Sequence, residues 1–258
     1  MSEFDGAHVL ITGASTGIGL AAARLLSERG ARVFLVARNA AKLEEAAREI
    51  KHAGGTAACA SADVSDRGAL LAALAAAEER FGPLAALFAN AGTGGRFASL
   101  GEYPDDVFEA VMRTNFYSVF WALKQVLPGM ITRRRGSILI TGSLASERGM
   151  PNNVAYLASK HGVLGLARAA AAEAAPHNVR VNCLVPGLIE TPMLMQLDPN
   201  SSADALRAMF GKAVPMGHIG SAKEAAELAC FLLSDRASHV TAQSLAVDGG
   251  ILGTFIPK

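Results

Sequence analysis

The sequence predicts an α/β fold in which a doubly wound, mostly parallel sheet of the Rossmann type carries helices on both faces. Short apolar runs alternate with helix-length amphipathic patterns from end to end, as in a series of βαβ units. The runs are almost continuously apolar, which is typical of parallel strands buried on both faces. The chain has 258 residues, 51% of them hydrophobic, and no repeat or linker divides it, so we expect one domain over residues 1–258.

The elements follow one another in a regular order. The apolar runs predict strands at 8–12, 31–37, 56–64, 84–92, 136–143, 179–187 and 244–250. The helical patterns predict helices near 18–29, around Leu43–Ile50, near 66–80, over 104–130, around 156–160 and near 222–234. The first helix is the clearest case, because its apolar residues all fall on one face.

The stretch 188–220 shows neither pattern and is too long for an ordinary connection. It contains Pro192, Pro199, Pro215 and several methionines. We therefore expect an irregular substrate lid over residues 188–216, with apolar and adaptable side chains.

Composition excludes several classes of protein. A net charge of +1 gives no electrostatic reason to expect nucleic acid as a partner. Three cysteines without a CxxC pair imply no disulfide framework, and six histidines without HExxH spacing imply no metal site. No apolar run reaches the length of a membrane span, and Met1–Gly6 is polar and acidic, unlike a secretory signal. A cytoplasmic protein is expected.

A glycine-rich turn, TGASTGIG, joins the first strand to the first helix at residues 12–19. Gly13, Gly17 and Gly19 allow the backbone to turn sharply and to approach a ligand closely. The helix behind them directs its free N–H groups at that ligand, which favours a pyrophosphate. The turn therefore predicts a dinucleotide site.

The end of the second strand bears on the choice of dinucleotide. An acidic residue there would bind the ribose 2′-hydroxyl of NAD, but the chain has Ala37 followed by Arg38. A guanidinium suits a 2′-phosphate, so NADP(H) is favoured, with NAD(H) as the alternative and Arg38 then a solvated loop residue. Asp63, after the third strand, either accepts a hydrogen bond from adenine or caps the next helix.

Tyr156 and Lys160 stand four residues apart in a predicted helix, so their side chains share one face. One interpretation is a surface tyrosine lying over the aliphatic stem of a lysine. The other is a tyrosine whose pKa, near 10 in water, is lowered by the neighbouring ammonium toward the range useful for acid–base catalysis.

Further motifs decide between these interpretations. They comprise TGxxxGxG at 12–19, NAG at 90–92, Asn115, Ser143 thirteen residues before Tyr156, YxxxK at 156–160, PG within 185–191 and VDGG at 247–250. In this ordered set the chain resembles the short-chain dehydrogenase/reductase family, in its single-domain branch of about 250 residues. The resemblance covers essentially the whole chain.

The resemblance implies hydride transfer between a nicotinamide and a ketone or secondary alcohol. Tyr156 would be the acid or base, and Lys160 would tune it and hold the nicotinamide ribose. Ser143 would bind the substrate oxygen, and Asn115 would hold a water that links Lys160 to solvent. Substrates small to medium in size and largely apolar are expected. The alternative is a non-catalytic dinucleotide-binding regulator on the same fold.

The resemblance also implies a set of cofactor contacts beyond the three glycines, Tyr156 and Lys160. They are Ser15, Ile18, Arg38, Asp63, Val64, Asn90, Ile189 and Thr191. Asn90 is expected to support the central sheet as well. Relatives that prefer NADP often have a basic residue where this chain has Thr16, so the cofactor preference rests on Arg38.

Family members usually form tetramers or dimers, and a homotetramer is the favoured assembly, with a dimer as the alternative. The alanine-rich segment 166–175 would allow close helix approach, and the apolar tail 249–257 would be covered by a neighbouring copy.

Overall fold

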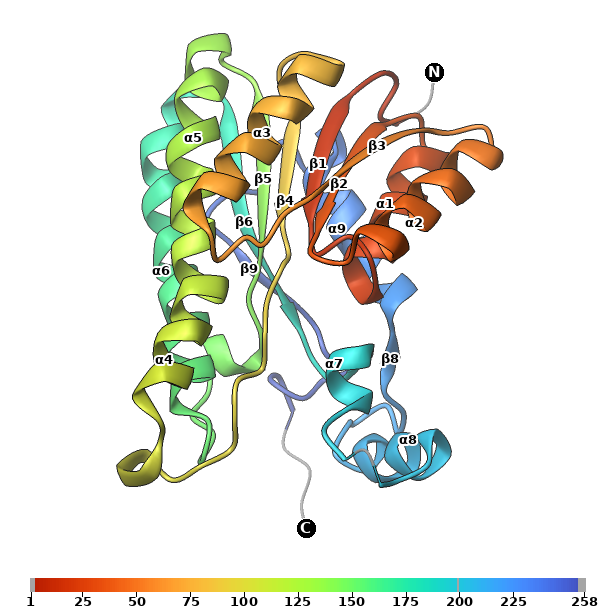
Figure 1. Cartoon of the computed structure of the whole chain (residues 1–258). Coiled ribbons are helices and arrows are strands. Elements are labelled where there is room, and N and C mark those ends of the chain that lie inside the picture. The colour runs from red at the N-terminus through yellow and green to blue at the C-terminus, as the bar shows by residue number, and fades with distance from the viewer. Residues whose placement is uncertain (1–2, 199, 255–258) are drawn as a thin grey trace.

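The computed structural model describes residues 3–198 and 200–254 and contains a seven-stranded sheet in the order β3-β2-β1-β4-β5-β6-β9. All six strand pairings are parallel (Figure 1). The strands are β1 (His8–Thr12), β2 (Arg32–Ala37), β3 (Thr56–Ser61), β4 (Ala86–Ala89), β5 (Gly136–Thr141), β6 (Val179–Pro186) and β9 (Ser244–Val247). The predicted doubly wound parallel sheet is confirmed.

Helices cover both faces of this sheet (Figure 1). One face carries α1 (Gly17–Glu28), α2 (Ala40–His52) and α9 (Ala222–Leu233). The other carries α3 (Arg67–Phe81), α5 (Ser118–Arg133) and α6 (Val154–Ala174). The buried side chains accordingly form two large clusters, one on each face.

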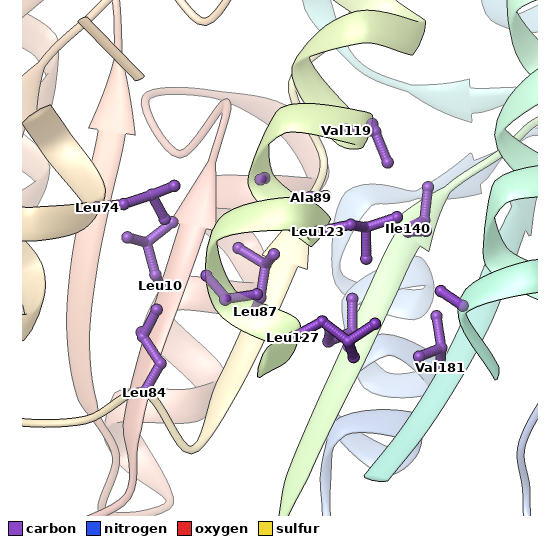
Figure 2. Close-up of a cluster of buried hydrophobic side chains, with 14 of the residues drawn as sticks. Leu10, Leu74, Leu84, Leu87, Ala89, Val119, Leu123, Leu127, Ile140 and Val181 are labelled. Carbon is purple, nitrogen blue, oxygen red and sulfur yellow. The ribbon is translucent and has the colours of Figure 1, made fainter. Parts of the chain in front are cut away.

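The strands feed both clusters because alternate side chains of a strand point to opposite faces. In β1, Leu10 belongs to the cluster under α3 and α5, whereas Val9 and Ile11 belong to the other. Figure 2 shows the first cluster, with side chains from the strands meeting those of α3 and α5. Each fully buried leucine of this kind contributes roughly 1.5–3 kcal/mol to folding.

The winding of the chain positions the site. It runs outward from β1 through β2 to β3 and then crosses over to β4, on the other side of β1. The connections at the carboxyl ends of β1 and β4 therefore lead to opposite faces, and ligands of such sheets bind in the crevice between them. The glycine turn after Thr12 and the NAG motif at 90–92 both lie at this point.

The predicted helix over 104–130 is in fact three helical segments. They are α4 (Asp105–Met112), a π-helical turn at Arg113–Tyr117 and α5. Apolar periodicity does not reveal a π turn, because one extra residue shifts the pattern only locally. Such turns are frequent at functional sites, and this one contains Asn115.

The prediction that 188–220 is irregular is wrong. The segment holds β7 (Ile189–Glu190), α7 (Pro192–Met195), α8 (Ala203–Gly211) and β8 (Gly220–Ser221), which pairs with β7. These elements are short, and Pro192 begins α7 instead of breaking it. Pro199 lies outside the described residues. A small separate cluster of Leu194, Val214 and Ile219 packs the segment.

No helix in residues 3–198 and 200–254 is long and apolar enough to cross a membrane. Within the same residues, no three side chains of His, Cys, Asp or Glu gather where they could bind a metal ion. Cys59, Cys183 and Cys230 are all free thiols.

Candidate active site

The turn between β1 and α1 has the geometry of an anion-binding cradle. Gly13 and Gly17 have φ angles of +67° and +57°, in the left-handed region that favours glycine. A Cβ on Gly19 would lie 2.4 Å from the Gly13 carbonyl oxygen, so no side chain fits there. Thr16 precedes α1 without capping it, and no acidic residue occupies the first turn, which leaves its N–H groups for an anion. Ser15 and Ile18 are half-buried on the same turn.

The segment that follows β6, which is distant in sequence, contacts this glycine turn. The Thr191 methyl carbon lies 3.2 Å from the position a Cβ on Gly17 would take, and Ile189 is buried. The structure therefore brings Thr191 to the glycine turn, whereas Ile189 packs against Gly220 of β8.

The ends of β2 and β3 bring Arg38 near Asp63. Arg38 is exposed, and its positive charge acts on the Asp63 carboxylate. Burial by itself would raise the pKa of Asp63, but hydrogen bonds from the Ser65 N–H (2.9 Å) and hydroxyl (2.8 Å), together with Arg38, lower it overall. Asp66 caps α3, so the alternative of Asp63 as the helix cap is wrong. The Val64 side chain is buried in the core, which leaves its backbone for any ligand contact.

Asn90 joins three strands at the switch point. Its Nδ2 donates to the carbonyl of Thr12 (3.1 Å), and its Oδ1 accepts from the Thr141 hydroxyl (3.1 Å). Its own backbone N–H donates to the Thr12 hydroxyl at 3.0 Å. The expected support of the central sheet is confirmed.

Lys160 is a buried ammonium at the base of the site, with only 4% of its surface exposed. Its Nζ donates to the carbonyl oxygen of Thr141 at 2.7 Å. Burial disfavours the charged form and lowers the pKa of Lys160 to about 8, and the nearby Cys183 sulfur opposes this shift.

Tyr156 lies next to this ammonium, with Nζ 5.6 Å from the centre of its ring. Burial nevertheless raises the pKa of Tyr156, and a hydrogen bond with Ser143 opposes the rise only in part. The prediction that Lys160 lowers the tyrosine pKa is therefore wrong for this structure. Loss of hydration is the main cause of the rise, and the Lys160 ammonium faces the tyrosine ring while it donates a hydrogen bond to the Thr141 carbonyl.

Ser143 is fixed by a turn that the sequence reasoning did not identify. It caps a short 3₁₀ turn at Leu144–Ser146, and its Oγ accepts from the Ala145 N–H at 3.2 Å. The buried Ser146 hydroxyl accepts in return from the Ser143 N–H at 3.1 Å. The signal was present as two serines three residues apart, the spacing of a capping box.

Asn115 is 1% exposed in the π turn, and its side chain binds the backbone after the NAG motif. Its Oδ1 accepts from the Thr93 N–H (2.8 Å), and its Nδ2 donates to the Thr93 carbonyl (2.9 Å) and the Ser159 hydroxyl (3.0 Å). Both amide protons are thus used within the protein. A Cβ on Gly92 would lie 3.4 Å from Oδ1 and 3.6 Å from the Lys160 Nζ, so the two side chains meet at that glycine.

These contacts bring all four predicted catalytic residues together beside the glycine turn. Comparison with known proteins then identifies the family. A protein family described as enoyl-(acyl carrier protein) reductase matches residues 13–252 of the chain. The chain belongs to the short-chain dehydrogenase/reductase family.

Relatives in this family cover nearly the entire chain. The monensin polyketide synthase putative ketoacyl reductase of Streptomyces virginiae is 36% identical over 99% of this chain and 100% of its own. The crystal structure of levodione reductase superposes with a TM-score of 0.93 at 35% identity, over 98% of this chain and 100% of that one. A single-substitution variant of actinorhodin polyketide ketoreductase, with NADPH, gives a TM-score of 0.91 at 35% identity, with the same coverage.

As a short-chain dehydrogenase/reductase, the chain is an oxidoreductase that acts on C=O and CH–OH groups. These three relatives carry the names of enzymes, and the alternative of a non-catalytic regulator finds no support among them.

Proposed function

We propose that the chain is an NADP(H)-dependent reductase of apolar ketones, acting in reverse on secondary alcohols, within one catalytic domain. The arrangement of Tyr156 between Ser143 and Lys160, next to the glycine turn, carries this proposal. The glycine turn and Arg38 fit the diphosphate and the 2′-phosphate of the cofactor.

Tyr156, Ser143 and Lys160 have separate roles in carbonyl reduction. When bound, the reduced nicotinamide supplies the hydride. Tyr156 donates the proton to the substrate oxygen, since a tyrosine, with an ordinary pKa near 10, holds its proton at neutral pH. Ser143 donates a hydrogen bond to the same oxygen and stabilises the charge that develops on it. With a pKa of about 8, Lys160 remains mostly charged at neutral pH and holds the ribose hydroxyls.

The choice of cofactor is tested by Arg38→Ala. A charge-assisted contact with a phosphate contributes roughly 1.5–3 kcal/mol, so the affinity for NADP(H) should fall by about one to two powers of ten while that for NAD(H) changes little. Arg48→Ala, which removes an exposed arginine from α2, is the matched control. Steady-state kinetics of both proteins with both cofactors measure the effect. Equal efficiency of the unmodified enzyme with NADPH and NADH would contradict the preference.

The segments around the site support an apolar substrate. Among the described residues, the exposed large apolar side chains other than Tyr117 and Phe120 all lie on segments 93–103, 144–153 and 188–219. They are Phe97, Leu100, Met150, Met193, Leu197, Met209 and Met216. Exposed apolar side chains gathered around a catalytic site indicate contact with an apolar ligand.

Residues 188–219 form the lid in this proposal. The charged side chains of the lid also support an apolar substrate. The Arg207 guanidinium donates to both oxygens of Glu190 at 3.1 and 2.5 Å and to Asp204 at 2.7 Å, so these ions satisfy one another. A screen of ketones, with each skeleton tested with and without a carboxylate, should favour the uncharged member. Preference for the carboxylates would contradict an apolar substrate.

We propose a homotetramer in the cytoplasm. Tyr117, at the end of the π turn, and Phe120, on α5, are exposed. On α6, Gly165, Ala169 and Ala172 face solvent at i, i+4 and i+7, a stripe that permits close helix packing. The free thiols suit a reducing compartment. Ala169→Arg should convert the assembly measured by light scattering to a smaller species. The tail beyond residue 254 lies outside the described residues.

A further inference from the structure

The loop formed by residues 93–98, here named the wall loop, is bonded to the start of α6, the helix that carries Tyr156. Asn153, the last residue before α6, donates from Nδ2 to the Gly94 carbonyl at 3.0 Å. Beside it, the Ala98 N–H donates to the Asn152 carbonyl at 2.9 Å. These bonds attach the wall loop one turn before Tyr156.

A second attachment lies beyond Tyr156. Thr93, at the beginning of the wall loop, is held by the Asn115 side chain, which also donates to the Ser159 hydroxyl. Ser159 in turn donates to the Tyr156 carbonyl at 2.8 Å. The wall loop is thus bonded to α6 on both sides of Tyr156.

The Asn153 side chain does not cap α6, the helix that it precedes. Asparagine is favoured at a helix N-cap because its side chain accepts a backbone N–H of the first turn, but Asn153 makes no such bond. It is 3% exposed, and its Oδ1 has no hydrogen-bond partner among residues 3–198 and 200–254. A buried, unpaired amide oxygen destabilises a fold, so stability alone does not explain an asparagine here.

The wall loop itself has little freedom near this contact. Gly95 has a φ of +69°, and a Cβ there would lie 2.8 Å from both the Tyr103 hydroxyl and the Val111 methyl group. The Arg96 N–H donates to the same Tyr103 hydroxyl at 3.3 Å. The conformation of the loop that carries the exposed Phe97 is therefore set by the packing of Gly95 against Tyr103 and Val111 together with the hydrogen bonds to α6.

We propose that Asn153 is a positioning residue that fixes the wall loop in register with Tyr156. A ketone resting on the wall loop then meets the tyrosine hydroxyl at a constant distance, because the same turn of α6 locates both. This inference rests on the proposed function, and it adds Asn153 to the four residues that the family motif supplies.

The test is Asn153→Leu, which keeps the four-atom side chain branched at Cγ and removes both the bond to Gly94 and the unpaired oxygen. Misplacement by about 1 Å lowers turnover by up to 10²-fold, so kcat should fall by about 10- to 100-fold. KM and the NADP(H) dissociation constant should change by less than about threefold, because the variant removes no side chain of the wall loop or of the glycine turn. The melting temperature should stay equal or rise.

Hydrogen exchange provides a measurement that needs no substrate. In Asn153→Leu, the amides of Arg96 and Ala98 should exchange about tenfold faster than in the unmodified protein. Asn178→Gly is the matched control, because it removes an amide-to-carbonyl bond with Arg134 at the other end of α6 and suits a residue with φ of +58°. It should change neither kcat nor exchange in the wall loop.

Unchanged exchange in the wall loop of Asn153→Leu overturns the proposal, whatever happens to activity. So does unchanged kcat, or a fall in kcat that accompanies a lower melting temperature and loss of NADP(H) binding. If the unmodified protein reduces no carbonyl compound, the proposed function fails, and the exchange experiment still decides whether Asn153 holds the loop.

Discussion

The catalytic residues and the lid are held in contrasting ways. Of the proposed catalytic residues, Lys160 and Asn115 are each at most 4% exposed. Lys160 bonds to the backbone of β5, and Asn115 bonds to the Thr93 backbone and to the buried Ser159. The segment proposed as a lid, residues 188–219, is packed by the small cluster of Leu194, Val214 and Ile219, separate from the two main cores. Segments with few buried apolar contacts open locally at low cost.

The lid attachments lie at the surface or on another short segment. Arg207 and Glu190 are both exposed ion-pair partners, and the Met216 N–H donates to the Gly249 carbonyl in the C-terminal segment. The difference teaches that the position of the reacting groups is fixed by the core, whereas the shape offered to the substrate can adapt. Methionine side chains on the lid suit such adaptation.

The largest effect should come from Tyr156→Phe. This variant tests whether the buried site around Lys160 supplies the proton for the reaction. The variant loses the proton donor but keeps the ring that Lys160 faces. Turnover should fall by about 10²–10⁴-fold or more, with NADP(H) affinity nearly unchanged in a fluorescence titration. Near-normal turnover with all ketones would remove Tyr156 from the mechanism.

Asn90→Ala tests the stability of the same region. The change leaves the Thr12 carbonyl and the Thr141 hydroxyl without their partner. A loss of about 1–3 kcal/mol in the free energy of unfolding is expected, measured by chemical denaturation. Asn178→Gly, at the surface, is the comparison. If both variants lose the same free energy of unfolding, the bonds from Asn90 to Thr12 and Thr141 do not stabilise the sheet more than a surface hydrogen bond does.

A smaller effect is expected in the lid, from Glu190→Gln. The variant weakens the ion pair with Arg207, so hydrogen exchange of the α8 amides should become faster. Because exposed ion pairs are weak, KM for an apolar ketone should rise by less than about fivefold. In the unmodified protein, NADP(H) together with a substrate analogue should slow exchange over 188–216. Identical protection with and without these ligands would argue against a mobile lid.

The smallest effect should come from His8, at the amino end of β1. It is 1% exposed, and its Nδ1 hydrogen bonds to the Gly82 carbonyl at 2.7 Å. Burial lowers its pKa, assisted by the charge of Arg32 and opposed by the Gly82 bond and Glu78. The unfolded chain therefore binds the proton first, and stability should fall as pH drops below about 6.5 and level off below the folded pKa.

His8→Gln removes this titration and keeps a hydrogen-bond donor. Denaturation curves of both proteins between about pH 7.5 and 5.5 should diverge, with the unmodified protein losing more stability. Parallel curves would show that His8 is protonated as easily in the folded state as in the unfolded one.

The sequence predicted the sheet, and it also indicated four candidate catalytic residues that the structure brings together, because both depend on local patterns. Apolar runs located the strands, and the spacing of Ser143, Tyr156 and Lys160 is set by one strand, one turn and one helix. Three features escaped prediction for physical reasons. The π turn at Asn115 changes the periodicity by one residue. The short helices α7 and α8 begin at Pro192 and Ala203, in a segment whose sequence is typical of a loop. The pKa of Tyr156 depends on burial, which only the structure shows. The cap formed by Ser146 was visible in the spacing but was not used.

The contacts of Asn90 also constrain the order in which the protein is made. They join residues separated by 78 and 51 positions, so the cofactor crevice cannot be completed until the ribosome has released residue 141. Contacts between distant parts of a chain form late in folding, because closing long loops costs entropy first. A partly synthesised chain should therefore be unable to use the cofactor as a scaffold. Capture of NADP(H) would then require that β1, β4 and β5 have already been joined by Asn90.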